Sequence, residues 1–407
     1  MSSVRRHERV LDEAARQLNA KGVSLTSLTE IAEKLGISRA AMYYYVEDRE
    51  DLVFQCYRRS CEITARYLNE ATREPGTAVE MITRFVTRML DPGEPELAAR
   101  AEIAMMTPAQ RDTVQGLYDA LASRLAHLLS TGQSEGLIRE CDVEVNARII
   151  LSLVTWAPLA RTWSRAGEAI DPNALLAAVL ATIFDGLGSE RGVAPEFVHY
   201  DLSSLCMRNG AVFDRDAISE AKRETLVSVA SRLFNRKGID ATSLEEIAAQ
   251  VGATKRTLHR HLGSKQDLVG ACYDRAFKIF LHIKDSMLAH PGTRLAAIAS
   301  AMHALAIAYP REDLSPLSPL VGFDALSPAA QEKFLQQSAE LADGYHETLR
   351  KGMEEGSIAT DLDVEARALV LPGLLSWLVK EDMPTDEARR KFIAGEIAKV
   401  VAVGLRA

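Results

Sequence analysis

The sequence predicts an all-α protein built from two tandem copies of one unit, and three observations support this. Apolar residues recur at spacings of three and four along most of the chain, and no alternating strand pattern of useful length occurs. The chain also repeats itself once: Asn19 to Gly36 aligns without a gap on Asn235 to Gly252, an offset of 216. Over residues 18–57, 15 of 40 positions are identical, which excludes chance.

Length and composition narrow the class of protein. The 407 residues are 47% hydrophobic and 26% charged, which is enough for full cores and excludes a disordered or fibrous chain. The five cysteines are scattered and form no CxxC motif, so we expect no metal, no cofactor and a reduced, cytoplasmic location. The N-terminus lacks the apolar run of a signal peptide, and the apolar runs at 174–184 and 369–379 are shorter than the roughly 20 residues that a bilayer needs. We therefore expect no membrane partner.

The repeat sets the expected domain boundaries. The offset drifts from 216 to 221, the value that relates Trp156 to Trp377, so a few residues separate the copies. Between them, Gly, Pro and aromatic residues without a helical period predict a linker that lies along a surface. The expected domains are an N-terminal helical domain at 1–47, a helical body at 48–188, the linker at 189–214, the copy of the N-terminal domain at 215–263 and a second body at 264–407. We expect nine or ten helices in each unit.

The repeated segment has the signals of a helix-turn-helix. A first helix over 4–21 ends at Gly22, and Ser27 with Glu30 predicts a capping box at the start of a short second helix that Gly36 ends. Ser38 then caps a third helix running through Tyr44; the copy has Thr254 and Arg260 there. Two short helices joined by a tight glycine turn place the second of them in the major groove of DNA, so 1–47 and 215–263 are the expected helix-turn-helix DNA-binding domains. Asp48 and Ser264 are the expected N-caps of a long fourth helix.

This order of features resembles the DNA-binding domain of TetR-family transcriptional regulators, over about 60 residues in each unit. The shared pattern is KG-(V/I)-x-x-TS-L-x-EIA-x-x-(L/V)-G, followed by a capped helix with aromatic residues. The long fourth helix then begins with (D/S)-(R/K)-x-DL. The rest of each unit is similar to that family's ligand-binding and dimerising domain in length and helix pattern only. Family members are usually homodimers of one unit, so the resemblance implies a single-chain, monomeric pseudodimer whose partners are a double-stranded DNA operator and a small-molecule effector.

The resemblance also implies which residues contact DNA. Ser38 and Tyr43 would lie on phosphates, and Arg39, Ala40 and Tyr44 would face base edges. The second unit departs from the family pattern where His259 and Leu262 replace Tyr and Phe. The full expected set is Thr26, Ser27, Ser38, Arg39, Ala40, Tyr43, Tyr44 and Arg49 in the first unit, with Thr242, Ser243, Thr254, Lys255, Arg256, Thr257, His259, Arg260 and Lys265 in the second.

Two features of the recognition segments allow other interpretations. Glu47 and Asp48 crowd the first recognition helix, which would make the first unit the weaker reader. The run His259 to His261 could be a metal site or a pH switch, but alternate positions on a helix diverge, which favours contacts with DNA.

The charge distribution agrees with DNA as a partner, although the total of −8 argues against it. The two DNA-facing segments, 1–60 and 214–276, together carry +3, so the remainder carries −11. Phosphate would be attracted at one end of such a molecule and repelled by the rest.

Aromatic and methionine side chains in the two bodies suit a small apolar or amphipathic ligand, although most such residues are ordinary core. The candidates are Phe85, Met89, Met105, Tyr118, Trp156, Phe280, His303, Phe323, Tyr345 and Trp377. The last two helices of each unit, at 145–165, 172–187, 364–380 and 385–405, are apolar on more than one side. We expect them to join the units as a four-helix bundle.

The sequence therefore predicts a ligand-responsive repressor that reads two half-sites with one chain. The residues do not distinguish a repressor from an activator, and a protein-binding adaptor built on degenerate helix-turn-helix units is a further alternative. An enzyme is not expected, because the sequence has no HExxH, P-loop, paired-carboxylate or Ser-His-Asp-type signature.

Overall fold

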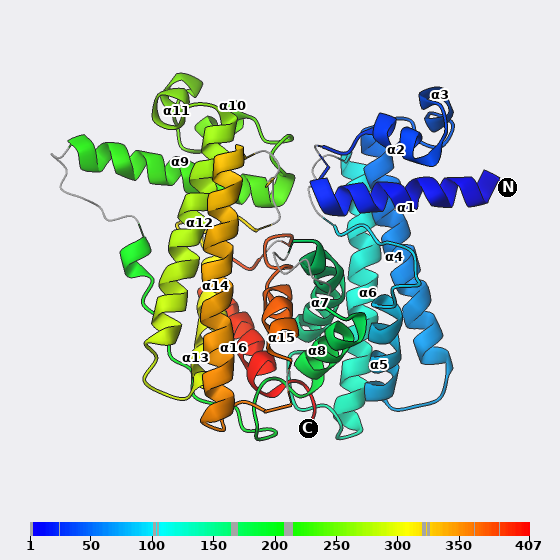
Figure 1. Cartoon of the computed structure of the whole chain (residues 1–407), viewed down its shortest axis with the longest axis vertical. Helices are drawn as coiled ribbons and strands as arrows, with labels where there is room; N and C mark the ends of the chain where they lie inside the picture. Colours follow the sequence, from blue (N-terminus) through cyan, green and yellow to red (C-terminus); the bar gives the residue numbers. More distant parts are fainter. Residues whose placement is uncertain are drawn as a thin grey trace.

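Two similar helical units lie side by side in the computed structural model (Figure 1). The structure describes residues 3–23, 25–100, 103, 106–163, 170–206, 215–319, 323, 326–361, 363–381 and 383–407. Within these ranges the regular secondary structure is helical, and the strand pairing is limited to two isolated antiparallel bridges, Ile138 with Arg406 and Gly188 with Ile358. The predicted all-α fold class is confirmed.

Each unit has eight α-helices among the described residues, fewer than the nine or ten expected. The first unit contains α1 (Ser3–Lys21), α2 (Leu28–Leu35), α3 (Arg39–Met42), α4 (Arg49–Arg73), α5 (Ala78–Met89), α6 (Pro108–Ser134), α7 (Val143–Trp163) and α8 (Pro172–Phe184). The second contains α9 (Arg215–Lys237), α10 (Leu244–Gln250), α11 (Lys255–Leu262), α12 (Lys265–Leu288), α13 (Arg294–Ala308), α14 (Pro328–Glu354), α15 (Val364–Val370) and α16 (Glu387–Val403).

Two helices are shorter than the sequence predicted. The helix expected over 364–380 ends at Val370 and continues as the 3₁₀ segment η4 (Leu371–Leu374), because Pro372 cannot donate the next backbone hydrogen bond. The helix expected to reach Tyr44 ends at Met42. Beyond it the backbone tightens, with Tyr45 N donating to Met42 O at 2.8 Å, as a run of aromatic residues gives little helix propensity.

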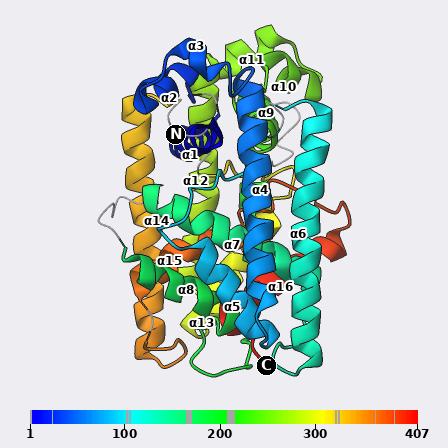
Figure 2. The same cartoon turned by 90° about the vertical axis from the view of Figure 1, so that its right-hand side faces the viewer.

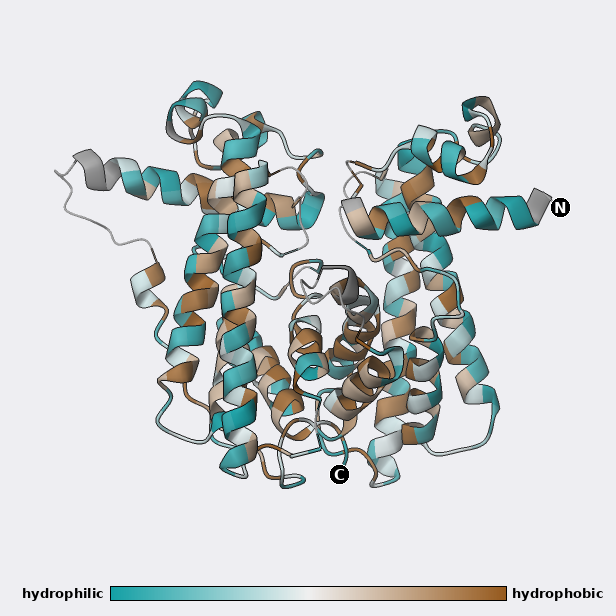
Figure 3. Ribbon diagram, in the orientation of Figure 1, coloured by the Kyte–Doolittle hydropathy of each residue, from teal (hydrophilic) through white to brown (hydrophobic). Residues whose placement is uncertain are grey.

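The predicted packing of the last helices between the units is confirmed, with α15 shortened. Helices α7, α8, α15 and α16 pack together at the centre, where Figure 3 shows mostly apolar residues. Trp156 Nε1 of α7 donates to Leu369 O at 2.9 Å, and Ser152 Oγ donates to Gly373 O at 2.6 Å. Gly373 is required there, because a Cβ would lie 2.8 Å from Trp156 Cδ1. These contacts join the two repeats into one core.

Helix α7 contains the one window in the described residues, Val143–Ala160, that is long and apolar enough to cross a membrane. Length and composition alone pass this test, and 72% of the window is buried inside the structure. We therefore interpret α7 as a core helix at the junction of the units.

The linker follows the surface of the second unit, as predicted, over its described part at 189–206. Val198 N donates to Ser300 Oγ at 3.0 Å, and the Tyr200 hydroxyl donates to Ala297 O at 3.1 Å. A short 3₁₀ turn, η2 (Ser203–Leu205), follows. Residues 207–214 of the predicted linker lie outside the described residues.

Candidate DNA-binding and effector sites

The helix-turn-helix of the first unit is built by the predicted caps, with one correction. Ser27 Oγ accepts from Glu30 N at 3.3 Å and Ser38 Oγ accepts from Ala41 N at 3.1 Å, while Gly36 takes the left-handed conformation, φ 65°, between α2 and α3. The predicted capping box is only half formed, because Ser27 N donates to Gln17 Oε1 at 3.4 Å and not to Glu30.

The second unit forms the same half of the capping box. Ser243 Oγ accepts from Glu246 N at 3.0 Å, while the Glu246 carboxylate pairs with Lys237.

Helix α3 and the turn after it expose the residues predicted to touch DNA. Arg39 and Ala40 are exposed, Tyr43 and Tyr44 are 49% and 76% exposed, and Met42 anchors the helix in the core. Arg39 Nη2 lies 3.5 Å from the Tyr43 hydroxyl. Large aromatic side chains left in water at the tip of a domain have no use in its own core, so they suit contact with a partner.

Helix α11 presents a more cationic surface. Thr254 Oγ1 caps it by accepting from Thr257 N at 3.2 Å, and Leu258 and Leu262 are buried in the core of the domain. The exposed side chains are Lys255, Arg256, His259 and Arg260. In this state Lys255 Nζ pairs with Glu245 at 2.6 Å, and His259 Nδ1 lies 2.9 Å from Gly263 O.

The residues predicted to bind phosphate at helix N-termini divide into two groups. Arg49 and Lys265 open α4 and α12; Arg49 is exposed, and burial lowers the pKa of Lys265. The prediction is wrong for the side chains of Thr26 and Thr242, which are 3% and 0% exposed. Their hydroxyls donate at 2.8 Å to Gly22 O and Gly238 O, respectively, and so hold the turn before the second helix.

Both recognition segments lie at the same end of the molecule (Figures 1 and 2). Each domain is attached to its body by an equivalent asparagine. Asn19 Nδ2 donates to Leu97 O and its Oδ1 accepts from Ala99 N, both at 2.9 Å. Asn235 makes the same pair of bonds with Pro316 O at 2.9 Å and Ser318 N at 2.8 Å. These clamps connect α1 and α9 to the segments that follow α5 and α13.

Three neighbouring cavities open in and beside the first body. The largest, about 450 Å³, lies between α4, the segment after α5, α7 and α8, and Met89 is among the residues that line it. Two smaller cavities of about 50 and 80 Å³ lie deeper; Tyr118 and Trp377 line the first and Trp156 lines the second.

A fourth cavity, about 730 Å³, lies between the linker, α13 and α16, and His303 lines it. Burial lowers the pKa of His303 to about 4.

The second body is filled by aromatic residues at the level where the first is hollow. The Phe334 ring lies 5.0 Å from Tyr273, 5.3 Å from Phe277 and 4.9 Å from Phe323. Phe280 and Phe85 are buried core residues, and Tyr345 packs against the core that contains Phe85, so the structure does not bring these predicted ligand residues to the cavities. Met105 lies outside the described residues.

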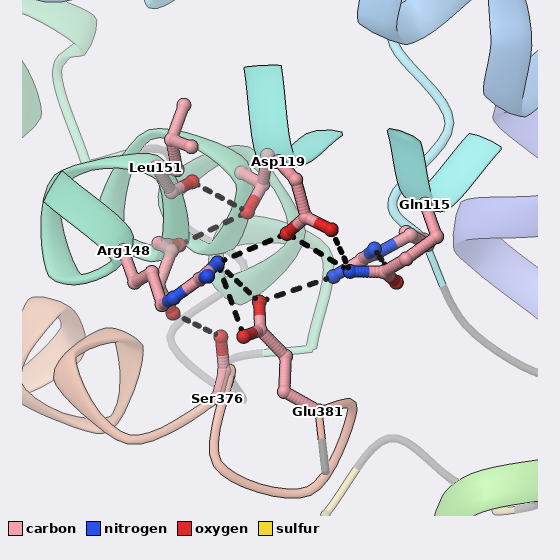
Figure 4. Close-up of polar contacts among 9 residues, drawn as sticks. Gln115, Asp119, Arg148, Leu151, Ser376 and Glu381 are labelled. Carbon is pink, nitrogen blue, oxygen red and sulfur yellow. Dashed lines mark hydrogen bonds and ion pairs between the residues drawn. The ribbon is translucent and has the colours of Figure 1, made fainter. Parts of the chain in front are cut away.

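A group of charged residues between the units escaped the sequence analysis. This interface cluster consists of Arg100, Asp119 of α6, Arg148 of α7, Lys380 and Glu381. Figure 4 shows Arg148 between the carboxylates of Asp119 and Glu381, at 3.4 and 3.1 Å. The one available signal was the pair Lys380 and Glu381, which ends the apolar run at 369–379.

Burial dominates the electrostatics of this cluster. Arg100 and Glu381 side chains are each 10% exposed and lie 3.5 Å apart, and the Arg100 guanidinium stacks 3.7 Å over the Tyr118 ring. Burial raises the pKa of Glu381, whereas burial and the nearby Arg100 lower the pKa of Lys380 to about 8. The described residues contain no group of three or more His, Cys, Asp or Glu side chains placed to hold a metal ion.

Comparison with known proteins agrees with the repeat. Residues 10–56 and 226–272 both match the family model of bacterial regulatory proteins, tetR family, and residues 79–187 match that of the tetracyclin repressor-like C-terminal domain. The HTH-type transcriptional regulator AcrR of Shigella flexneri is 27% identical over 136 residues, 30% of this chain and 63% of that protein, so the match spans less than two thirds of this relative.

Two further similarities cover nearly a whole relative. The HTH-type transcriptional repressor KstR2 of Rhodococcus jostii (strain RHA1) is 26% identical over 193 residues, 45% of this chain and 91% of the repressor. The crystal structure of the TetR family regulator PfmR from Thermus thermophilus aligns with a TM-score of 0.38 and 23% identity, covering 44% of this chain and 97% of that one.

Proposed function

Since the chain belongs to the TetR family of transcriptional regulators, we propose that it is a cytoplasmic, ligand-responsive repressor that reads both half-sites of an operator with one polypeptide. The observation that carries this proposal is the presence of two capped helix-turn-helix domains, joined through one core, at the same end of the molecule. The family is not enzymatic.

Covalent joining changes how such a regulator meets DNA. The second domain binds at a high effective concentration once the first is bound, so occupancy does not depend on dimerisation of separate chains. Recognition helices that fit successive major grooves need a spacing of about 34 Å, one helical turn of DNA. We propose that the shared core of α7, α8, α15 and α16 holds this spacing when no effector is bound.

The two recognition surfaces differ in chemistry, so we propose that the operator is an imperfect palindrome. The first unit offers a single cation, Arg39, beside Ala40 and the aromatic surface of its two exposed tyrosines. Lys255, Arg256 and Arg260 of the second unit offer several donors that suit guanine edges and phosphates.

A small amphipathic effector would enter the first body, where the 450 Å³ cavity lies, and not the aromatic-filled second body. Its binding would favour a state in which the recognition helices no longer match the grooves. A coupling free energy of about 1–3 kcal/mol between effector and DNA is typical of such systems.

Selection from random double-stranded DNA tests the operator proposal. The expected result is two unlike half-sites about one helical turn apart, bound with a steep dependence on salt. A perfect palindrome would contradict the asymmetric reading. Failure to enrich or shift any DNA at low salt would instead favour the adaptor interpretation, in which the helix-turn-helix units bind protein.

A further inference from the structure

We propose that the interface cluster binds the carboxylate of a monoanionic, amphipathic effector, at one site per chain built from residues of both units. This inference rests on the proposed function, because it names the chemistry of the effector. The observation that carries it is that Arg100 and Lys380 both line two small cavities beside the first body.

The interface cluster contains three cationic side chains and only two carboxylates, those of Asp119 and Glu381. Glu381 accepts from both Arg148 and Arg100, and Asp119, 47% exposed, pairs with Arg148. The Lys380 ammonium makes no hydrogen bond or ion pair with any residue that the structure describes, although Glu381 is its neighbour. A partly buried cation without a paired anion is costly, and an incoming carboxylate would remove that cost.

The cavities fix the size of the anionic group. Arg100, Ser376 and Lys380 line both the 50 Å³ and the 80 Å³ cavity, so the two cations lie between them. One water needs about 10–15 Å³ of such space. There is thus room for a few waters or a carboxylate, but not for a head group as large as a nucleotide.

The neighbouring 450 Å³ cavity fixes where the rest of the ligand lies. Four residues line both this cavity and the 50 Å³ cavity, so the two cavities adjoin: Ser60, Thr64, Ala98 and Thr155. Apolar side chains then line the larger cavity: Met89, Leu90, Val154, Leu159, Ile170 and Leu175. Asp91, Glu94 and Glu96 also line it and would repel a second negative charge, so the site favours a monoacid over a diacid.

The second unit has no copy of this site. The offset of 221 that relates Trp156 to Trp377 places Leu159 and Ala160 opposite Lys380 and Glu381. Leu97 and Pro316, which accept from the equivalent asparagines Asn19 and Asn235, are 219 positions apart in the sequence. The same offset places Pro319 opposite Arg100. The pseudosymmetry therefore brings the charged residues together once.

The site also contacts the C-terminal ends of α1 and α9, where the two DNA-binding domains join their bodies. Arg100 directly follows the segment that Asn19 clamps to α1. The 80 Å³ cavity is lined by Leu18 and Gly22 at the end of α1 and by Asn235 and Arg236 near the end of α9. An anion that draws Arg100 and Lys380 together would move both attachments at once.

Titration of the purified full chain, without DNA, tests the proposal with straight-chain alkanoates of four to twelve carbons and the alcohols and terminal diacids of equal length. Trp377 and Trp156 line the two small cavities, so tryptophan fluorescence and calorimetry both report binding. We expect one alkanoate per chain, with at least about tenfold weaker binding of the matching alcohol and diacid. Binding of no alkanoate, equal binding of acid and alcohol, or two sites per chain would overturn the proposal.

Variants separate a binding role from a structural one. Lys380→Met should weaken alkanoate binding at least about tenfold and raise the melting temperature of the ligand-free chain, because it removes an unpaired cation. Lys380→Arg should keep the preference for the acid. Lys351→Met, which removes an exposed lysine paired with Glu347, is the matched control and should bind as the parent does. Unchanged binding by Lys380→Met would overturn the proposal.

Measuring operator binding distinguishes failure of the proposed anion site from failure of the proposed function. If the ligand-free chain and Lys380→Met both bind the selected operator but no alkanoate binds, only the effector chemistry is wrong. If alkanoates bind and no DNA does, the anion site stands and the proposed regulator does not.

Discussion

Replacing Asn235 with alanine should loosen the second DNA-binding domain from its body. Asn235 is 8% exposed, its amide donates to Pro316 O at 2.9 Å and its carbonyl accepts from Ser318 N at 2.8 Å. The substitution leaves one backbone carbonyl and one backbone N–H without a partner in buried surroundings. Each such group costs about 1–3 kcal/mol, so we expect a loss of about 2–6 kcal/mol from this attachment.

Amide hydrogen exchange is the suitable assay, because the loss concerns one attachment and not global unfolding. A loss of about 2–6 kcal/mol corresponds to exchange in α9 to α11 that is about 30- to 20,000-fold faster, with little change in α1 to α3. The equivalent Asn19→Ala should have a smaller effect, about fivefold in α1 to α3, since Asn19 is only half-buried and water can replace its contacts. Acceleration below about threefold for Asn235→Ala, or a larger effect for Asn19→Ala, would refute this reasoning.

Three other predictions concern recognition, pH and thiol chemistry. Arg256→Ala should cost about 1–3 kcal/mol at one half-site and leave the other unchanged, whereas Arg39→Ala should affect the opposite half-site, as measured by titration of singly mutated operators. Burial lowers the pKa of His303 from 6.5 to about 4, so the unfolded chain binds more protons between these values and stability should fall by up to about 3 kcal/mol on acidification from pH 6.5 to 4; denaturant titration of His303→Phe should lack this loss. Burial raises the pKa of both Cys56 and Cys272 to about 12, so a thiol reagent at about pH 8 should modify them only after unfolding, and fast labelling of the native chain there would contradict the structure.

The parts of the fold that depend on local rules could be predicted from the sequence. Ser38 and Thr254 cap their helices as expected, because a cap needs only a side-chain oxygen three residues before its donor. Cys56 and Cys272 occupy equivalent positions of the repeat, 216 residues apart. Both are buried, and their thiols donate to Leu11 O and Val227 O, which the offset of 216 also relates.

What depends on partners far along the chain could not be predicted. Thr26 looks the same in sequence whether its hydroxyl faces a phosphate or the carbonyl of Gly22, and only the packed turn decides. The interface cluster joins Arg100 and Arg148 to Glu381 across more than 230 residues, so no local pattern could reveal it. The break after Val370 was readable from Pro372, but the apolar pattern on both sides favoured a continuous helix.

The central claim is that one chain occupies both half-sites, and the mass of the complex tests it most directly. Native mass spectrometry of the chain with a selected operator, together with a footprint of the same complex, gives stoichiometry and coverage in one comparison. The account predicts one chain per duplex and protection of two unlike half-sites about one helical turn apart. Two chains per duplex, each protecting one half-site, would contradict it.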